Sequence, residues 1–306
     1  MLEQADFKTS DASSYDLLAD RFDHYTERVS RYAVDTLLDT VSDCDGDIID
    51  IGCGTGIVTL EAGRRFGGDK KIIGVDLSDG MLDLANRKAE ANGLSDAVKF
   101  AKADAENLPF SDNSIGAAVS LYAIRHFPHP EKAFEEIFRV VKPGGRIAVA
   151  AGSSPSLFSI NGIAAAVKRI SREIMQRTGR ELAACDHIDS LVQEFLPSPT
   201  ASEVAEWTEH RHGYSGSLKT LACLAGFHIV KDQWIGKQFE IASVQEFWEL
   251  QTTFSSVARK RLKNARPKDV KTLKYKFDEQ CNAVLARGGR LVYRVGTAVV
   301  IANKPL

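Results

Sequence analysis

Three glycines at alternating positions interrupt the apolar stretch DIIDIGCGTGIVTL, which begins at Asp47. The β-branched residues between 48 and 51 predict a buried strand, and residues 57–62 carry apolar side chains at helical spacing. The glycines therefore lie at a strand-to-helix turn. Such a turn lets backbone N–H groups approach a ligand closely and points the positive end of a helix dipole at it. This chemistry suits the binding of a nucleotide cofactor.

The turn belongs to a stretch, residues 46–151, in which strands and helices alternate. Strands are predicted at Ile48–Ile51, Ile72–Val75, Val98–Ala101, Ile115–Leu121 and Arg146–Ala151. Helices are predicted to begin near Thr55, Ser78 and Glu131. Repeated βα units of this kind predict a doubly wound parallel sheet that binds its ligand at the carboxyl ends of the strands.

The rest of the chain surrounds this core. Residues 15–41 carry aromatic and apolar side chains every three or four positions, which predicts an amphipathic helix. We divide the chain into an N-terminal helical cap (1–45), the core (46–151), a helical insertion (152–216) and the C-terminal part of the sheet (217–306), which contains a helical pair at 243–288. Helix Leu218–Leu224, a strand from Phe227 and a last strand at 291–304 are expected in the C-terminal part, and Thr200 and Glu203 form a candidate capping box in the insertion. Because both insertions lie outside the repeating core, we expect them to select the substrate.

The glycine spacing distinguishes between cofactors. A dinucleotide fingerprint needs glycine or alanine at the last position of G-x-G-x-x-G/A, and here that position is Ile57. A phosphate-binding P-loop is also missing, because no Gly-Lys-Ser/Thr follows. The pattern present is an acidic residue, Asp50, then an apolar residue, then Gly52, Gly54 and Gly56.

This pattern resembles the class I S-adenosylmethionine-dependent methyltransferases. The resemblance covers about residues 46–151 and also rests on IIGVDLSDGML, ADAENLPF, LPFSDNSIGAAVS and EEIFRVVKPGGRIAVA, which follow in the family's order. It implies an α/β fold with a Rossmann-like seven-stranded sheet, mostly parallel, whose last strand, here residues 291–302, is antiparallel. It also implies S-adenosylmethionine as the cofactor.

The resemblance assigns roles to acids at the strand ends. Asp50 would support the glycine turn and the amino end of the methionine moiety. Asp76, which follows Gly56 by 20 residues, would accept hydrogen bonds from both ribose hydroxyls. Asp104 would accept from the adenine amino group, with the Ala105 backbone beside it. The remaining expected cofactor contacts are Cys53 through its backbone, Leu77, Met81, Leu121, and Tyr25 of an N-terminal helix that closes over the cofactor, with Tyr15 and Phe22 as alternatives to Tyr25.

Methyl transfer from a sulfonium is an in-line displacement. The protein must align the acceptor, exclude water and, for a hydroxyl acceptor, remove a proton. The segment LYAIRHFPHP at 121–130 follows the fourth strand and should face the methyl group. His126 in this segment matches a histidine frequent in relatives and is the candidate base; a backbone-capping histidine is the alternative. Arg125 is a candidate for binding an acidic acceptor, or a solvated arginine.

Two further residue groups were considered as a metal site and as an acceptor pocket. The motif EHRHGY at 209–214 contains alternate histidines, but it lacks a defined ligand spacing, so no metal site is expected. Phe158, Trp207, Tyr214 and Trp234 lie in or beside the insertions and either line an acceptor pocket or pack in the core.

Composition and charge bear on the partners and the location of the protein. A net charge of −2 offers no basic surplus for nucleic acid, and five scattered cysteines argue for a reducing compartment. The N-terminus is polar, unlike a signal peptide, and the apolar stretch at 160–167 is too short to span a membrane. We therefore expect a cytoplasmic enzyme without a membrane span.

These observations predict an S-adenosylmethionine-dependent methyltransferase of a small-molecule acceptor, an apolar or aromatic metabolite, in a group resembling quinone-pathway and natural-product enzymes. Nucleic-acid and protein acceptors are disfavoured because LYAIRHFP replaces the Asn-Pro-Pro-aromatic signature of many relatives that methylate amino groups. An NAD(P)-dependent oxidoreductase and a non-catalytic cofactor-binding interaction protein are the alternatives. The sequence leaves open whether oxygen, nitrogen or carbon is methylated and whether the chain forms a homo-oligomer.

Overall fold

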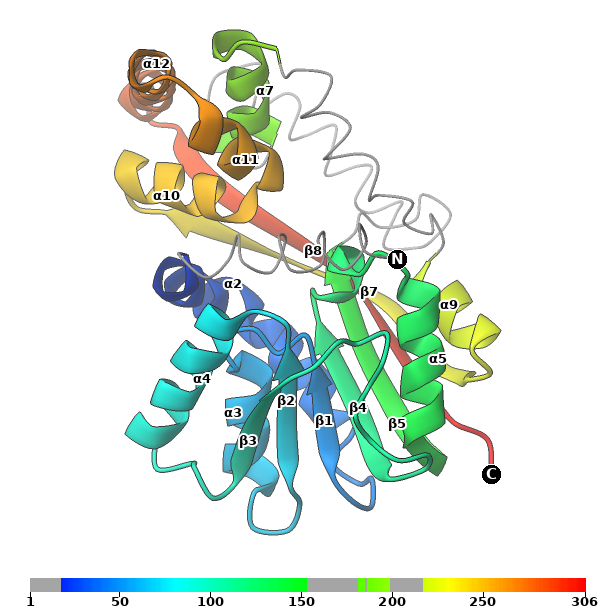
Figure 1. Cartoon of the computed structure of the whole chain (residues 1–306). Coiled ribbons are helices and arrows are strands. Elements are labelled where there is room, and N and C mark those ends of the chain that lie inside the picture. The colour runs from blue at the N-terminus through cyan, green and yellow to red at the C-terminus, as the bar shows by residue number, and fades with distance from the viewer. Residues whose placement is uncertain (1–17, 153–180, 185, 199–216) are drawn as a thin grey trace. The chain divides into compact units, whose positions relative to one another are not determined.

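The computed structural model describes residues 18–152, 181–184, 186–198 and 217–306. The chain divides into two compact units (Figure 1). The first comprises Met1–Ser153, Trp207–Ile235 and Thr297–Leu306, and the second comprises Ser154–Glu206 and Gly236–Gly296. The Thr200–Glu203 capping box and the aromatic residues at 158, 207 and 214 lie outside the described residues.

The first unit contains most of a largely parallel sheet, whose last strands continue into the second unit. Its strands follow the order β3 (Val98–Lys102), β2 (Ile72–Asp76), β1 (Ile48–Ile51), β4 (Ile115–Leu121), β5 (Val141–Gly152) and β8 (Arg290–Asn303), with β7 (His228–Ile241) paired to β8. The first five strands are parallel, and β8 runs antiparallel to β5, with Arg146 opposite Asn303 and Gly152 opposite Thr297. The prediction of a doubly wound sheet with an antiparallel last strand is confirmed.

The strand count differs from the prediction. Among the described residues the sheet has eight strands rather than seven. The additional strand, β6 (Glu181–Ala183), pairs in parallel with residues 290–292 of β8. Three residues are too few to display a strand periodicity, so the sequence pattern could not predict this element.

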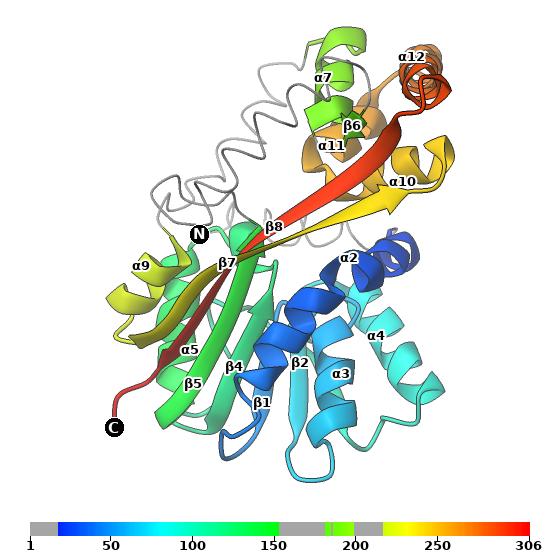
Figure 2. The ribbon, with the colours of Figure 1, turned by 180° about the vertical axis from the view of Figure 1, so that it is seen from behind.

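Helices cover both faces of the sheet in the first unit (Figures 1 and 2). Helices α2 (Ala19–Asp39) and α3 (Ile57–Phe66) pack on one face, and α5 (Pro130–Val140) and α9 (Leu218–Leu224) pack on the other. Helix α4 (Asp79–Ala91) follows β2, and a short 3-10 helix, η1 (Ile124–His126), follows β4. This arrangement leaves the carboxyl ends of the parallel strands to carry the site.

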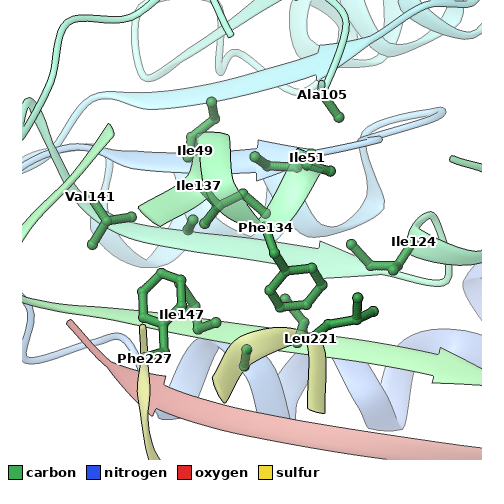
Figure 3. Packing of buried hydrophobic residues seen from close by; sticks show 14 of the residues in the cluster. Ile49, Ile51, Ala105, Ile124, Phe134, Ile137, Val141, Ile147, Leu221 and Phe227 are labelled. Atoms are coloured by element: carbon green, nitrogen blue, oxygen red, sulfur yellow. The ribbon is translucent and has the colours of Figure 1, made fainter. Parts of the chain in front are cut away.

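Strand β1 is buried on both faces because helices cover both faces of a parallel sheet. Ile49 and Ile51 point to the core formed with α5 and α9, whereas Ile48 joins the core formed with α2 and α3. Figure 3 shows the first of these cores, in which Phe134 and Ile137 of α5 lie among residues of the strands and of α9. The alternation along β1 is the period of two expected for a strand.

The second unit contains α7 (Asp186–Phe195), α10 (Val244–Phe254), α11 (Ser256–Asn264) and α12 (Pro267–Ala286). Phe277 of α12 lies 5.8 Å from Phe247 and 5.0 Å from Trp248, between ring centroids. The prediction of a helical pair at 243–288 was wrong, since three helices occupy this segment. Ser255 separates the first two because its hydroxyl accepts from the Ala258 N–H and caps α11.

Candidate cofactor site

The glycine turn connects β1 to α3. Gly52, Gly54 and Gly56 all have positive φ angles, of 68°, 52° and 81°. A Cβ at Gly52 would lie 2.2 Å from the Ala123 Cβ, and one at Gly56 would lie 2.9 Å from the Phe100 ring, so close packing adds to the backbone requirement. A Cβ at Gly54 would meet no described atom within 4 Å. The turn is therefore open at its middle glycine.

Several N–H groups of the turn are used within the fold. Those of Gly52 and Cys53 both donate to the Val75 carbonyl, at 2.8 and 2.9 Å, and that of Gly56 donates to the Cys53 carbonyl at 2.9 Å. Burial, together with the carboxyl groups of Asp76 and Asp50, raises the pKa of the Cys53 thiol well above its usual range. A protonated thiol suits a residue that contributes its backbone rather than a nucleophile.

Asp76 is the last residue of β2 and joins the turn to the next helix. Its carboxylate accepts from the Gly54 N–H at 2.9 Å and from the Ser78 N–H at 3.0 Å. Burial raises the pKa of Asp76, while hydrogen bonds from the Ser78, Gly54 and Leu77 N–H groups and the nearby His126 act to lower it. The expected ribose-binding acid thus stands beside the open glycine.

Asp50 lies in the middle of β1 and is 1% exposed. One carboxyl oxygen accepts from the Thr59 N–H at 3.1 Å and from the Thr59 hydroxyl at 2.6 Å. Its other oxygen, Oδ1, is buried and has no hydrogen-bond partner in the described part of the chain. Burial raises the pKa of Asp50 to about 7, and the charge of Asp76 acts in the same direction. Asp50 is therefore hydrogen-bonded to α3, the helix that follows the turn it was expected to support.

The start of α4 is fixed by a cap. The Ser78 hydroxyl accepts from the Met81 N–H at 3.2 Å, which satisfies one N–H of the first helical turn. Met81 is 3% exposed and packs with Ala19, Leu84 and Phe22. Leu77, between the acid and the cap, is half-buried. The two residues lie on the same connection as Asp76, and their contact with the cofactor stays a prediction.

Asp104 and Ala105 follow β3. The Asp104 carboxylate accepts from the Glu106 N–H at 2.9 Å, and its carbonyl accepts from the Asn107 N–H at 3.0 Å. Ala105 is 7% exposed and belongs to the core beside Ile51 and Val75. The tight turn places both residues at the carboxyl edge of the sheet, where the adenine role was expected.

The end of β4 carries the candidate base. Leu121 is half-buried and ends the strand, and His126 is exposed in η1 with its N–H bonded to the Ala123 carbonyl at 2.8 Å. The charge of His126 acts to lower the pKa of Asp76, the acid expected to bind the ribose. Arg125 is also exposed. Both residues lie where the acceptor was expected.

The sequence interpretation missed a hydroxyl cluster after β4. Tyr122 has a φ of 62°, which is unusual for a bulky residue. Its hydroxyl lies 2.6 Å from the Thr297 hydroxyl, and the Tyr32 hydroxyl lies 2.7 Å from the same Thr297 oxygen. Burial raises the pKa of Tyr122 well above its usual range, so the phenol stays neutral. No local pattern could have revealed contacts between residues so far apart in sequence.

Helix α2 contributes Tyr25 and Phe22 to this unit. Tyr25 is 3% exposed and makes an edge contact with His24, with ring centroids 4.8 Å apart. Phe22 is half-buried and packs against α4 through Met81 and Leu84. The third aromatic candidate, Tyr15, lies outside the described residues. Contact between these rings and the cofactor stays a prediction.

Metal sites and membrane-spanning helices can be assessed only in the described residues. In that part of the chain no group of three or more His, Cys, Asp or Glu side chains could hold a metal ion. His210 and His212 of the EHRHGY motif lie outside it. Among the described helices, none combines the length and hydrophobicity needed to cross a bilayer.

Two observations make the residues compatible with a nucleotide cofactor. Gly54 presents open space beside the Asp76 carboxylate, and Asp50 keeps a buried oxygen that could accept a further hydrogen bond. Both features lie at the turn between β1 and α3. Buried polar atoms are normally hydrogen-bonded, so an unpartnered carboxyl oxygen here indicates a missing hydrogen-bond partner.

Comparisons with known proteins concern the same part of the chain. Residues 49–149 match the model of a family described as methyltransferase domain. The chain is 31% identical over 165 residues to the ubiquinone/menaquinone biosynthesis C-methyltransferase UbiE of Idiomarina loihiensis, covering 52% of this chain and 62% of that protein. It is 37% identical over 108 residues to the demethylmenaquinone methyltransferase of Symbiobacterium thermophilum, covering 35% of this chain and 43% of that protein.

The solved structure of a Bacillus halodurans protein proposed to be a methyltransferase has a similar fold. Its TM-score is 0.53 at 19% sequence identity, and the match covers 90% of this chain and all (100%) of that one. At this level of identity the likeness concerns the fold alone.

A glycine turn after the first strand, an acid at the end of the second and an antiparallel last strand are typical of α/β domains that bind a nucleotide cofactor. The match of residues 49–149 to the methyltransferase domain confirms, for this part of the chain, the prediction of a class I S-adenosylmethionine-dependent methyltransferase with S-adenosylmethionine as its cofactor. The chain spans 62% of the length of the Idiomarina relative, and less of the Symbiobacterium one.

Proposed function

We propose that this chain transfers the methyl group of S-adenosylmethionine to a ring carbon of a quinol-type small molecule. The observation that carries the proposal is the hydrogen bond from the Gly54 N–H to Asp76, in a domain that is similar to two quinone-pathway methyltransferases. The names of these two relatives point to an electron-rich aromatic acceptor. A small apolar acceptor also fits the absence of a basic surplus in the sequence.

Bound S-adenosylmethionine supplies an electrophilic methyl group on a sulfonium. This methyl group would pass to a ring carbon of the acceptor, and the proton on that carbon would be released to water. Removal of a proton from a ring hydroxyl makes that carbon more nucleophilic. His126 is the side chain at the end of β4 that would take this proton, since neutral imidazole accepts protons near physiological pH.

The other residues bind and orient. Asp76 would hold the ribose hydroxyls, Asp104 the adenine amino group, and the Gly54 backbone would allow the cofactor to approach closely. Alignment and exclusion of water then supply most of the rate for a carbon acceptor. The insertions at 152–216 and 243–288 would form the acceptor pocket.

Transfer of labelled methyl tests the proposal. The full chain is incubated with methyl-labelled S-adenosylmethionine and a panel that contains a demethylated quinol, a phenol and an amine. We expect label at a ring carbon of the quinol, located by mass spectrometry and NMR. Label on oxygen or nitrogen would correct the acceptor atom, and a protein that binds S-adenosylhomocysteine but transfers no label to any acceptor would favour the non-catalytic alternative.

A further inference from the structure

Three side chains from separate elements meet at the glycine turn. The Thr55 hydroxyl donates to a carboxylate oxygen of Asp23, on α2, at 2.6 Å. The Lys88 ammonium, on α4, donates to the same Asp23 oxygen and to the Thr55 carbonyl, the latter at 3.1 Å. The Asp23 and Lys88 side chains are 21% and 24% exposed, so water screens this ion pair less than a surface pair. We refer to these three residues as the Asp23 cluster.

The Asp23 cluster holds the turn through both its side chain and its backbone. Thr55 is 2% exposed and lies between the open Gly54 and the N-cap glycine of α3. Its carbonyl belongs to the peptide group shared with Gly56, whose φ is 81°. Fixing that carbonyl therefore orients the peptide plane next to the place where the cofactor must approach.

The Asp23 cluster also connects α2 to the turn. Next to Asp23, Phe22 packs against Met81 and Leu84 of α4, so apolar and polar contacts hold the same part of α2. Farther along α2, Asp35 and Asp39 pair with Arg65 of α3. This second attachment joins the same helix to α3 without touching the glycine turn, and it provides a matched comparison.

We propose that Asp23 is a positioning residue that couples α2 to the conformation of the cofactor turn, with Lys88 as its partner. The inference rests on the proposed function, because it concerns the affinity of the turn for S-adenosylmethionine. Without the carboxylate, the Thr55 hydroxyl loses its acceptor and the Lys88 ammonium loses its counter-charge. The turn then samples other peptide orientations, and ordering it again opposes cofactor binding.

Calorimetric titration with S-adenosylhomocysteine tests the proposal on the full chain. Asp23→Asn, which keeps the side-chain shape and an acceptor oxygen but removes the charge, should raise the dissociation constant about tenfold, because Lys88 and Thr55 then donate to a neutral group that holds the turn more weakly. Lys88→Met should give a similar increase. The double variant should bind only as weakly as the weaker single variant, since the two side chains act as one unit.

The control variant is Asp35→Asn, which removes one partner of Arg65. Its unfolding midpoint in urea should change by no more than that of Asp23→Asn, because Arg65 keeps Asp39 and Glu61 as partners. Its dissociation constant should stay within about twofold of wild type. Equal weakening of cofactor binding by both variants would overturn the proposal, because general docking of α2 would then explain the effect.

The outcomes separate this inference from the proposed function. A folded wild-type chain that does not bind S-adenosylhomocysteine would contradict the proposed function itself. Wild-type binding that Asp23→Asn and Lys88→Met leave unchanged would remove only the role of the Asp23 cluster. With a substrate in hand, Asp23→Asn should raise KM for S-adenosylmethionine about tenfold and leave kcat at saturation nearly unchanged, as expected for a lost binding interaction.

Discussion

Two buried carboxyl groups, Asp50 and Asp76, flank the glycine turn and differ in their hydrogen bonding. Asp76 accepts from backbone N–H groups on both sides, whereas Asp50 accepts only from Thr59 and leaves Oδ1 unpartnered among the described residues. Burial raises the pKa of both, and it raises that of Asp50 to about 7. The site therefore contains an acid that titrates near neutral pH in the folded chain.

Asp50 should make stability depend on pH. Its folded pKa of about 7 exceeds its ordinary value of 3.8, so the folded chain keeps a proton that the unfolded chain releases. The free energy of unfolding should therefore fall as pH rises from about 4 to about 7, by up to about 1.4 kcal/mol per pH unit from this group. Asp50→Asn should remove this slope in urea unfolding measured across that range.

Other acids titrate in the same range, so the comparison between variants matters. Asp45→Asn, at an exposed position nearby, should leave the pH dependence of wild type in place. An Asp50→Asn variant whose stability still followed the wild-type pH curve would show that Asp50 does not carry the buried proton.

His126 should affect the rate but not cofactor binding. For an acceptor whose ring hydroxyl must lose a proton, His126→Ala should lower kcat by roughly 10²–10⁴, the usual contribution of a general base. The pH profile of kcat should also lose its acidic limb, and the affinity for S-adenosylhomocysteine should stay close to wild type. An alanine variant that keeps both its kcat and its pH profile would leave His126 a structural residue.

At this scale the sequence predicted residues that belong to a local pattern. The glycines and Asp76 could be predicted to lie together because their spacing reflects a strand, a turn and a helix in succession, and their contact with the cofactor stays a prediction. Tyr122 and Thr297 were missed because their contact depends on pairing of β8 with β5, which brings distant parts of the chain together. The hydrogen bond between Asp50 and Thr59 also spans the turn, and the two residue types alone do not predict it.

Helix α5 is the element whose packing is easiest to test. Phe134 is fully buried, and Figure 3 shows its ring within the core beside Leu221 of α9. Phe134→Ala should lower the free energy of unfolding by about 3–5 kcal/mol, through lost burial and the cavity left behind. Urea unfolding provides the measurement. Glu135→Ala, exposed on the same helix, should change it by less than about 0.5 kcal/mol, and similar values for the two variants would contradict this packing.

Elements with strong periodicity were predicted closely. β1, β4 and α9 have the predicted bounds, and α5 begins one residue before the expected position. β5 extends further than predicted: the Lys-Pro-Gly-Gly breaker at 142–145 ends α5 but lies within the strand. Short or weakly amphipathic elements, such as β6 and α11, were missed because helix capping and strand pairing, rather than local pattern, decide them.

At the scale of the whole molecule, the family match and the second compact unit involve different parts of the chain. The methyltransferase family match covers 49–149, while residues 154–206 and 236–296 make up the second unit. That the insertions select the acceptor stays a prediction, as does the division into a cap, core and insertions. The turn and acids predicted to bind the cofactor, in contrast, lie within the matched region. Cofactor binding can therefore be tested without knowing the acceptor.

Calorimetric titration of S-adenosylhomocysteine into wild type, Asp76→Ala and Asp79→Ala tests the central claim, that the glycine turn and Asp76 bind this cofactor. Wild type should bind, and Asp76→Ala should bind more weakly by ~1–3 kcal/mol, because charge-assisted hydrogen bonds to the ribose are lost. Asp79→Ala removes an exposed acid three residues away and should bind as wild type does. Tight binding of NADH with no response to S-adenosylhomocysteine, or equal S-adenosylhomocysteine affinity in wild type and Asp76→Ala, would contradict the account.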